Sequence, residues 1–135
     1  MTNVAIFEWP VRVYYEDTDT GGVVYYANYL KFMERARTEW LRSLGFEQDV
    51  LIRDAGIIFA VRSVEVDYLR PAHFNDALQV SAEVIHNGGA SITFRQEIRR
   101  ADAVLCRGTV KIACLDAQTL RPKPAPAELL AALEH

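Results

Sequence analysis

The stretch YANYLKFMERARTEWLRSLGF (26–46) decides how this chain folds, because its apolar residues recur at helical spacing. The residues that fall three or four positions apart are Tyr26, Tyr29, Leu30, Met33, Ala36, Arg37, Trp40, Leu41 and Leu44, of which Arg37 is the charged one. This spacing predicts one long amphipathic helix over 26–44. We expect its outer face to carry the charged residues Lys31, Glu34, Arg35, Arg37, Glu39 and Arg42. Gly45 stands where a left-handed residue ends many helices, and Phe46 is expected to fold back on Leu41.

Predicted strands lie on both sides of this helix. Residues 11–16 (VRVYYE) carry the β-branched and aromatic residues typical of a strand. After the helix, four segments alternate apolar and polar residues like half-buried strands: 59–68, 77–86, 90–100 and 103–115. The Asn-Gly pair within HNGG (86–89) predicts a hairpin between the second and third of these. Residues 121–126 (RPKPAP) should end the sheet, and residues 126–135 are expected to form a short helix or a frayed tail.

These elements predict a single α+β domain over residues 1–135, in which one face of an antiparallel sheet wraps around the long helix. Such a sheet has exposed edges and only one helix to cover it. We therefore expect dimerisation through an edge strand.

Composition excludes several classes of protein. The 135-residue chain is 50 % hydrophobic and 24 % charged, which suits a globular domain and is too apolar for a disordered chain. Its net charge of −3 argues against nucleic-acid binding, which normally needs a basic surplus. No run approaches the ~20 apolar residues of a membrane-spanning helix. Glu8 interrupts the first apolar run, so no signal peptide is predicted either.

The two cysteines point to a reducing compartment. Cys106 and Cys114 lie on one predicted strand, roughly 26 Å apart at ~3.3 Å per residue, so they cannot pair with each other. We therefore expect a cytoplasmic protein with two reduced thiols.

The acidic turn EDTDTGG (16–22) looks at first like the start of a calcium loop. Asp17 and Asp19 would take positions 1 and 3 of that loop. Gly21 would then stand at position 5, which needs an oxygen ligand, and Asn28 at position 12, which needs a bidentate Glu. The sequence therefore predicts no calcium site at this turn.

Other standard sites are also absent from the sequence. It has no nucleophile elbow, no P-loop, no dinucleotide-binding glycine motif and no Cys/His pair at metal spacing. Its three histidines, His73, His86 and His135, are scattered, and we expect loop or surface roles for them. The sequence thus predicts neither a metal nor a cofactor.

The turn and the helix start together suit an oxyanion. Gly21 and Gly22 let the backbone come close to a ligand, and the unpaired N–H groups of the first helical turn carry the positive end of the helix dipole. A carboxylate about one turn away could act as a nucleophile or as a general base on water. Alternatively, Asp17 and Asp19 only form the turn or cap the helix. The residues by themselves leave both interpretations open.

A family resemblance bears on this choice. The run VYYEDTDTGGVVYYANYLKFMERARTEWLR (13–42) resembles the signature segment of hotdog-fold acyl-CoA thioesterases of the YbgC type, which are associated with the Tol–Pal system. The run VRSVEVDYLRPAHFNDALQV (61–80) is similar to that family's second and third strands. The resemblance implies a long helix wrapped by a five-stranded antiparallel sheet, dimers that join their sheets, and an active site at the subunit interface.

The resemblance also assigns roles to residues. It makes Asp19 the catalytic aspartate and the backbone N–H of Tyr26 the donor that polarises the thioester carbonyl. Family members commonly have His where this chain has Tyr26, so any role of an imidazole is lost or replaced by a phenol. Tyr15 is expected either to orient Asp19 or to pack in the core. The positions expected to bind substrate are Gly21, Gly22, Val23, Asn28 and Arg62.

Coenzyme A needs positive charge near its phosphates. Two predicted strands could supply it through Arg95, Arg99, Arg107 and Lys111, or these residues form a solvated face balanced by Glu97. The related 4-hydroxybenzoyl-CoA thioesterase carries a basic cluster near the turn that is HNGGAS (86–91) here. This turn has no Lys or Arg, which argues against that substrate.

Two functions follow. The first is a homodimeric or homotetrameric enzyme that hydrolyses acyl-CoA or acyl-carrier-protein thioesters. The second is a non-catalytic hotdog protein that holds an acyl chain or docks on an envelope-assembly partner. Asp19 and the glycine pair favour the enzyme, because a pure binder has no use for a carboxylate facing a thioester.

Overall fold

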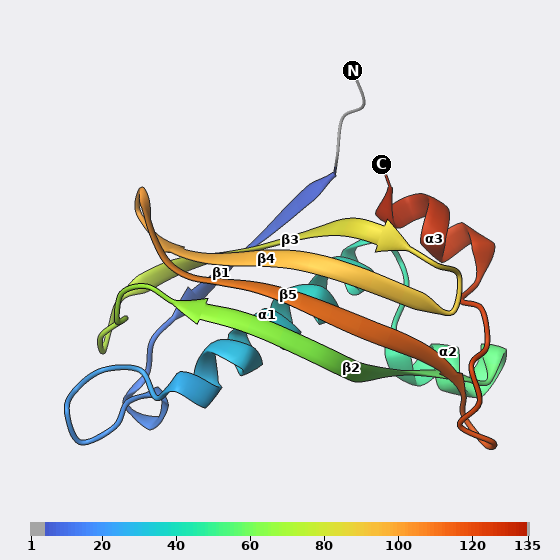
Figure 1. Ribbon diagram of the computed structural model, residues 1–135, viewed down its shortest axis with the longest axis horizontal. Coiled ribbons are helices and arrows are strands. Elements are labelled where there is room, and N and C mark those ends of the chain that lie inside the picture. The colour runs from blue at the N-terminus through green and yellow to red at the C-terminus, as the bar shows by residue number, and fades with distance from the viewer. Residues whose placement is uncertain (1–4, 135) are drawn as a thin grey trace.

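The computed structural model describes residues 5–134, which form an α+β domain (Figure 1). Its five-stranded antiparallel sheet has the order β1-β3-β4-β5-β2, so β1 and β2 are the edge strands. The strands are β1 (Ile6–Arg12), β2 (Ile57–Tyr68), β3 (Ala77–Asn87), β4 (Ser91–Arg100) and β5 (Ala103–Asp116). The helices are α1 (Tyr26–Ser43), α2 (Gln48–Ala55) and α3 (Ala127–Leu133), and a 3₁₀ turn covers Tyr15–Asp17.

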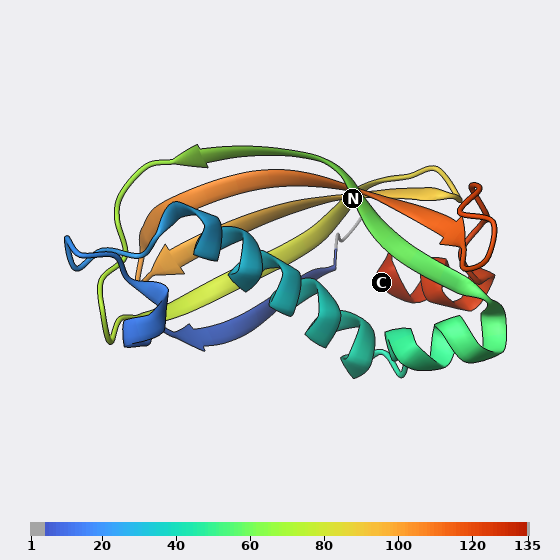
Figure 2. The same cartoon turned by 90° about the horizontal axis from the view of Figure 1, so that it is seen from below.

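Helix α1 lies across one face of the curved sheet, and α2 and α3 lie beyond its C-terminal end (Figure 2). Phe32, Met33 and Ala36 on α1 are fully buried. They belong to one apolar cluster with the sheet residues Leu78, Val80, Ile98, Leu105 and Cys106. The predicted long helix, its apolar stripe and the α+β architecture are confirmed. Within residues 5–134, no helix has both the length and the apolar character needed to cross a membrane.

The first strand is displaced from its predicted position, since it spans Ile6–Arg12 rather than residues 11–16. Pro10 has no N–H to donate to a neighbouring strand. It is tolerated in β1 because β1 is an edge strand, which has a partner strand on one side only. The strand ends where the Tyr14 N–H donates to the Asp17 carboxylate, at 2.9 Å, and the chain turns into the 3₁₀ segment.

Helix α2 was not predicted, and the expectation that only strands follow α1 is wrong for this segment. It has eight residues, of which Leu51 is the buried one, and about two turns are too short for apolar spacing to identify a helix. The helix ends at Gly56, whose φ of 66° is left-handed. A glycine directly after a short polar helix was the signal that could have located it.

Arg37 was predicted both within the three- and four-residue repeat of α1 and among the charges of its outer face, and only the second assignment is wrong. Its guanidinium is partly buried and donates to Gln96 Oε1 at 2.9 Å, and Gln96 is fully buried on the sheet. Burial lowers the pKa of Arg37 below its usual value. The repeat of α1 therefore placed Arg37 correctly, and its acceptor on the inner face of β4 is the part that periodicity could not reveal.

The remaining local predictions hold. Gly45 has a left-handed φ of 91°, and the Phe46 N–H donates to the Leu41 carbonyl at 2.9 Å, as expected for the end of α1. The hairpin between β3 and β4 is formed. Cys106 and Cys114 are free and buried. Burial raises the pKa of the Cys106 thiol to about 12, so it is protonated at neutral pH.

Candidate active site

The acidic turn folds back tightly against the start of α1. Thr18 and Val24 form an isolated antiparallel bridge, and the Asp19 N–H donates to the Val23 carbonyl at 2.9 Å. The Tyr25 N–H donates to the Asp17 carbonyl, also at 2.9 Å. These bonds place the segment carrying Asp19 at the same end of the molecule as the first turn of α1.

Asp19 is the exposed acid of this turn. Its Oδ1 accepts the Gly21 N–H at 2.8 Å, and its other oxygen accepts no bond from the residues that the structure describes. A Cβ at Gly21 would lie 3.2 Å from Asp19 Oδ1, closer than most such contacts. Gly22 has a φ of 80°, which favours glycine. The left-handed φ favours glycine at position 22, and the close Asp19 carboxylate favours a residue without a side chain at position 21.

Asp17 is the buried acid, with 4 % of its surface exposed. Its Oδ2 accepts the Tyr14 N–H and its Oδ1 accepts the Asn28 side-chain amide, both at 2.9 Å. The two aspartates therefore differ in environment although they stand two residues apart.

Helix α1 begins without a side-chain cap, so the idea that Asp17 or Asp19 caps it is wrong. Within residues 5–134, the Tyr26 N–H donates to no other group. An N–H at a helix start carries partial positive charge and can bind a negatively charged oxygen. The idea that Asp19 shapes the turn is correct, since its carboxylate bonds the Gly21 N–H.

Tyrosine rings surround the start of α1. The Tyr68 hydroxyl donates to the Tyr26 carbonyl at 3.2 Å, and the two rings meet edge to face. A shallow pocket of about 270 Å³ is bordered by Val24, Tyr26, Tyr29 and Tyr68. Burial raises the pKa of Tyr29 and of Tyr68, so both phenols stay protonated at neutral pH. The free N–H of Tyr26 thus belongs to a residue that lines a pocket with largely apolar walls.

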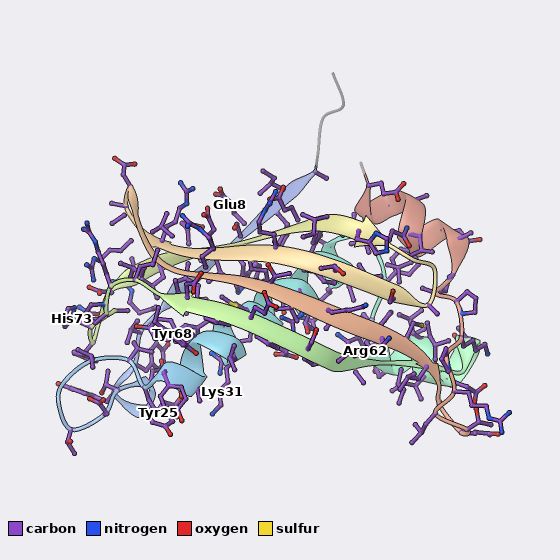
Figure 3. The ribbon with its side chains drawn as sticks, viewed as in Figure 1. Glu8, Tyr25, Lys31, Arg62, Tyr68 and His73 are labelled. Atoms are coloured by element: carbon purple, nitrogen blue, oxygen red, sulfur yellow. The ribbon has the colours of Figure 1, made fainter. Side chains whose placement is uncertain are left out.

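The predicted site residues fall into two groups. Gly21, Gly22, Val23 and Asn28 lie with Asp19 in the turn or in the first turn of α1. Figure 3 shows Tyr25, Tyr68 and His73 at this end of the molecule and Arg62 further along β2 towards α2. Arg62 stands six positions before Tyr68, or roughly 20 Å along the strand. A single chain therefore does not bring Arg62 to the turn.

Tyr15 does not pack in the core, since 75 % of its surface is exposed. Its ring stacks on Phe74, with ring centres 3.8 Å apart. Its role beside Asp19 stays a prediction.

The sequence did not indicate that the loop before β3 would join this end of the molecule. His73 forms an isolated bridge with Val23, and Asp76 accepts both the His73 N–H, at 2.8 Å, and the Arg100 guanidinium, at 2.7 Å. Burial alone would raise the pKa of Asp76, but the two donors outweigh it and hold that pKa below its ordinary value. No spacing signal links residues some fifty positions apart, so sequence reasoning could not have found this contact.

The basic residues on the outer face of the sheet are mostly paired. Arg95 bonds Glu83, while Arg99 and Arg107 both bond Glu97. These pairs are those of a charge-balanced face, and the role of the three arginines toward coenzyme A stays a prediction. Among residues 5–134, no group of three or more potential ligands (His, Cys, Asp or Glu) is placed to hold a metal ion.

Comparison with known proteins identifies the family. The thioesterase-like superfamily matches residues 13–133, so this chain belongs to that superfamily. It is 47 % identical over 129 residues to the acyl-CoA thioesterase YbgC of Haemophilus influenzae, which covers 96 % of this chain and 95 % of the relative. It is 37 % identical over 111 residues to the Helicobacter pylori acyl-CoA thioesterase YbgC, which covers 82 % of this chain and 70 % of the relative. The predicted resemblance to the YbgC type is confirmed.

Solved structures give the same fold. The crystal structure of a probable thioesterase from Bartonella henselae matches with a TM-score of 0.85 and 34 % identity, over 90 % of this chain and 100 % of that one. A mutant 4-hydroxybenzoyl-CoA thioesterase complexed with 4-hydroxybenzoyl-CoA matches with a TM-score of 0.88 at 17 % identity, over 96 % of this chain and 99 % of that one, which supports the fold alone. The chain therefore has the hotdog fold that the resemblance implied.

Proposed function

We propose that this protein is an acyl-CoA thioesterase that hydrolyses a thioester to a free acid and a thiol. The observation that carries the proposal is the exposed Asp19 carboxylate on a turn bound to the start of α1, where the Tyr26 N–H has no partner within residues 5–134. A carboxylate and a free amide at one end of a helix are the two groups that ester-type hydrolysis needs. The names of the YbgC relatives support the same chemistry.

In the general-base route, Asp19 removes a proton from water while the water oxygen attacks the thioester carbonyl carbon. The oxygen of the tetrahedral intermediate carries negative charge and accepts the Tyr26 N–H. The intermediate then collapses, the C–S bond breaks, and the departing thiolate takes the proton back from Asp19. In the nucleophile route, Asp19 attacks the carbonyl itself, expels the thiolate and forms an anhydride that water hydrolyses. The proposal covers both routes.

Substrate positions follow from the same geometry. Gly21, Gly22 and Val23 would lie against the reacting group, and the pocket beside Tyr26 would hold the start of the acyl chain. Arg62 would bind coenzyme A only if a second subunit brought it to the turn. An acyl-carrier-protein thioester is the other substrate that this chemistry allows.

We also propose that a homodimer or homotetramer builds the complete site, and that each chain is a single cytoplasmic hotdog domain. Edge strand β2 supports this, because it carries exposed apolar side chains. Val61 and Tyr68 on the strand are 53 % and 46 % exposed, and Leu69 directly after it is 50 % exposed. A groove of about 360 Å³ between α1 and β2 is lined by Leu30, Met33 and Val64 among others. A second β2 strand paired with this edge would cover that apolar surface. Light scattering should give a multiple of 15.3 kDa, and a fully active 15.3 kDa species would contradict the proposal.

The thioesterase proposal is tested with a thiol-release assay on a panel of acyl-CoAs from acetyl to palmitoyl, plus a hydroxybenzoyl thioester. We expect thiol release above background for at least one chain length. No release with any of them would leave the alternative, a non-catalytic hotdog protein that binds an acyl chain or a Tol–Pal partner. Preference for the hydroxybenzoyl thioester would instead indicate an aromatic-acyl thioesterase.

A further inference from the structure

Asp17 is a buried carboxylate that the proposed mechanism does not use. Its side chain accepts the Tyr14 N–H and the Asn28 side-chain amide, and its carbonyl accepts the Tyr25 N–H, all at 2.9 Å. One residue therefore ties together the end of β1, the acidic turn and the first turn of α1. A buried carboxylate that loses such partners destabilises its surroundings, because nothing replaces the water it gave up.

The Asp17–Asn28 pair spans the two halves of the proposed site. Asp17 precedes Asp19 by two residues, and Asn28 follows Tyr26 by two. One member therefore belongs to the segment that carries the exposed carboxylate and the other to the segment that carries the free amide. Asn28 is itself buried, so the bond between the pair is shielded from water.

We propose that Asp17 and Asn28 form a positioning pair that fixes the Asp19 carboxylate relative to the Tyr26 amide. The inference rests on the proposed thioesterase function and assigns to Asn28 a role different from direct substrate binding. Neither residue would touch the reacting atoms. Their effect would come through geometry, because a displacement of about 1 Å in an active site can lower the rate on the order of 10²-fold.

An exchange of the two side chains tests this at nearly constant shape. Asp17→Asn sets an amide against the Asn28 amide or against the Tyr14 N–H, so one donor loses its acceptor. Asn28→Asp sets two carboxylates against each other. In the double variant, the amide introduced at position 17 donates to the carboxylate introduced at position 28, and its oxygen accepts the Tyr14 N–H.

We expect each single variant to lose about 10- to 100-fold in kcat, with KM changed by less than about threefold, in protein that circular dichroism shows to be folded. The double variant should recover kcat to within about threefold of the wild type, which makes the two losses strongly non-additive. Asn87→Asp is the matched control. Asn87 also donates its amide to a carboxylate, that of Glu134 at 3.1 Å, but outside the proposed site, and its substitution should leave kcat unchanged.

Separate outcomes would overturn the inference and the proposed function. Folded single variants with wild-type kcat, or a double variant that regains thermal stability without kcat, would make the pair purely structural. If the single isosteric variants do not fold, Asn28→Ala and the double variant decide by the same kcat criterion. A wild-type protein inactive on the whole acyl-CoA panel would instead refute the proposed function itself.

Discussion

The two ends of helix α1 are built in opposite ways. At the C-terminal end, the N–H groups of Leu44, Gly45 and Phe46 bond the last carbonyls of the helix, and Trp40 and Leu41 are buried beneath them. At the N-terminal end, no side chain caps the helix, and the Tyr26 N–H has no partner among the described residues.

Under the proposed function, the C-terminal end of α1 serves stability and the N-terminal end serves catalysis. We call the C-terminal end of α1 closed and its N-terminal end open. The closed end satisfies its backbone polar groups internally and therefore contributes to the stability of the fold. The open end leaves the Tyr26 N–H without a partner among residues 5–134 and the Asp19 carboxylate exposed, and in the proposed mechanism both groups act on the thioester. Substitutions at the two ends should accordingly change different measurements.

The largest expected effect is at the open end. Asp19→Asn keeps an oxygen that can accept the Gly21 N–H but removes the charge and the basicity. Loss of a general base should lower kcat on the order of 10²–10⁴-fold, while the midpoint of thermal unfolding barely moves. Initial rates of thiol release and a melting curve measure the two quantities. A folded variant that keeps more than roughly a tenth of wild-type turnover would show that the turn is acidic for structural reasons only.

At the closed end, Gly45→Ala should show the reverse pattern. The φ of 91° is left-handed, and no atom lies within 4 Å of an added Cβ, so the penalty comes from the backbone alone. We expect a loss of about 1–2 kcal/mol in the free energy of unfolding, with kcat unchanged well below the melting temperature. Urea unfolding paired with the thiol-release assay measures this. A drop in kcat in fully folded protein would mean that the two ends are coupled.

Asp76 allows a smaller, pH-dependent test near the open end. Its pKa is held below the ordinary value in the folded protein, so its bonds to His73 and Arg100 stabilise the fold above the unfolded pKa of about 3.9. That stabilisation is lost as the pH falls through the folded pKa. Asp76→Asn should therefore be less stable than the wild type at pH 7, and the difference should shrink in acid. Urea unfolding of both proteins at pH 7 and in acid measures the difference in their free energies of unfolding. A difference that stays constant with pH would contradict the assignment.

The smallest expected effect is that of Tyr26→His. The proposed donor is the backbone N–H, which this substitution keeps, and the family resemblance implied His as the more usual residue here. We expect kcat to stay within about threefold of the wild type or to rise. Loss of an oxyanion donor would lower kcat on the order of 10²-fold or more, and this substitution keeps the donor. A loss of more than about tenfold would show that the phenol takes part in the reaction.

Local sequence patterns determined much of the fold. The three- and four-residue spacing located α1, Gly45 located its end, and alternation located four of the five strands, because these signals depend on neighbours along the chain. Local signals failed where a distant contact decided the outcome. Strand β1 lies at Ile6–Arg12, where it pairs with β3 some seventy positions away, and the buried partner of Arg37 is Gln96 on β4.

The candidate site divides along the same line. The sequence by itself determined that an acidic, glycine-rich turn precedes a helix start, and the family resemblance singled out Asp19 and Tyr26 there. Only the tertiary structure decided that Asp17 is buried against Asn28 while Asp19 is exposed, and that His73 and Asp76 lie at the same end. The physical reason is that burial and hydrogen-bond partners depend on which distant segments pack together, and two aspartates in one D-x-D motif carry no local mark of that difference.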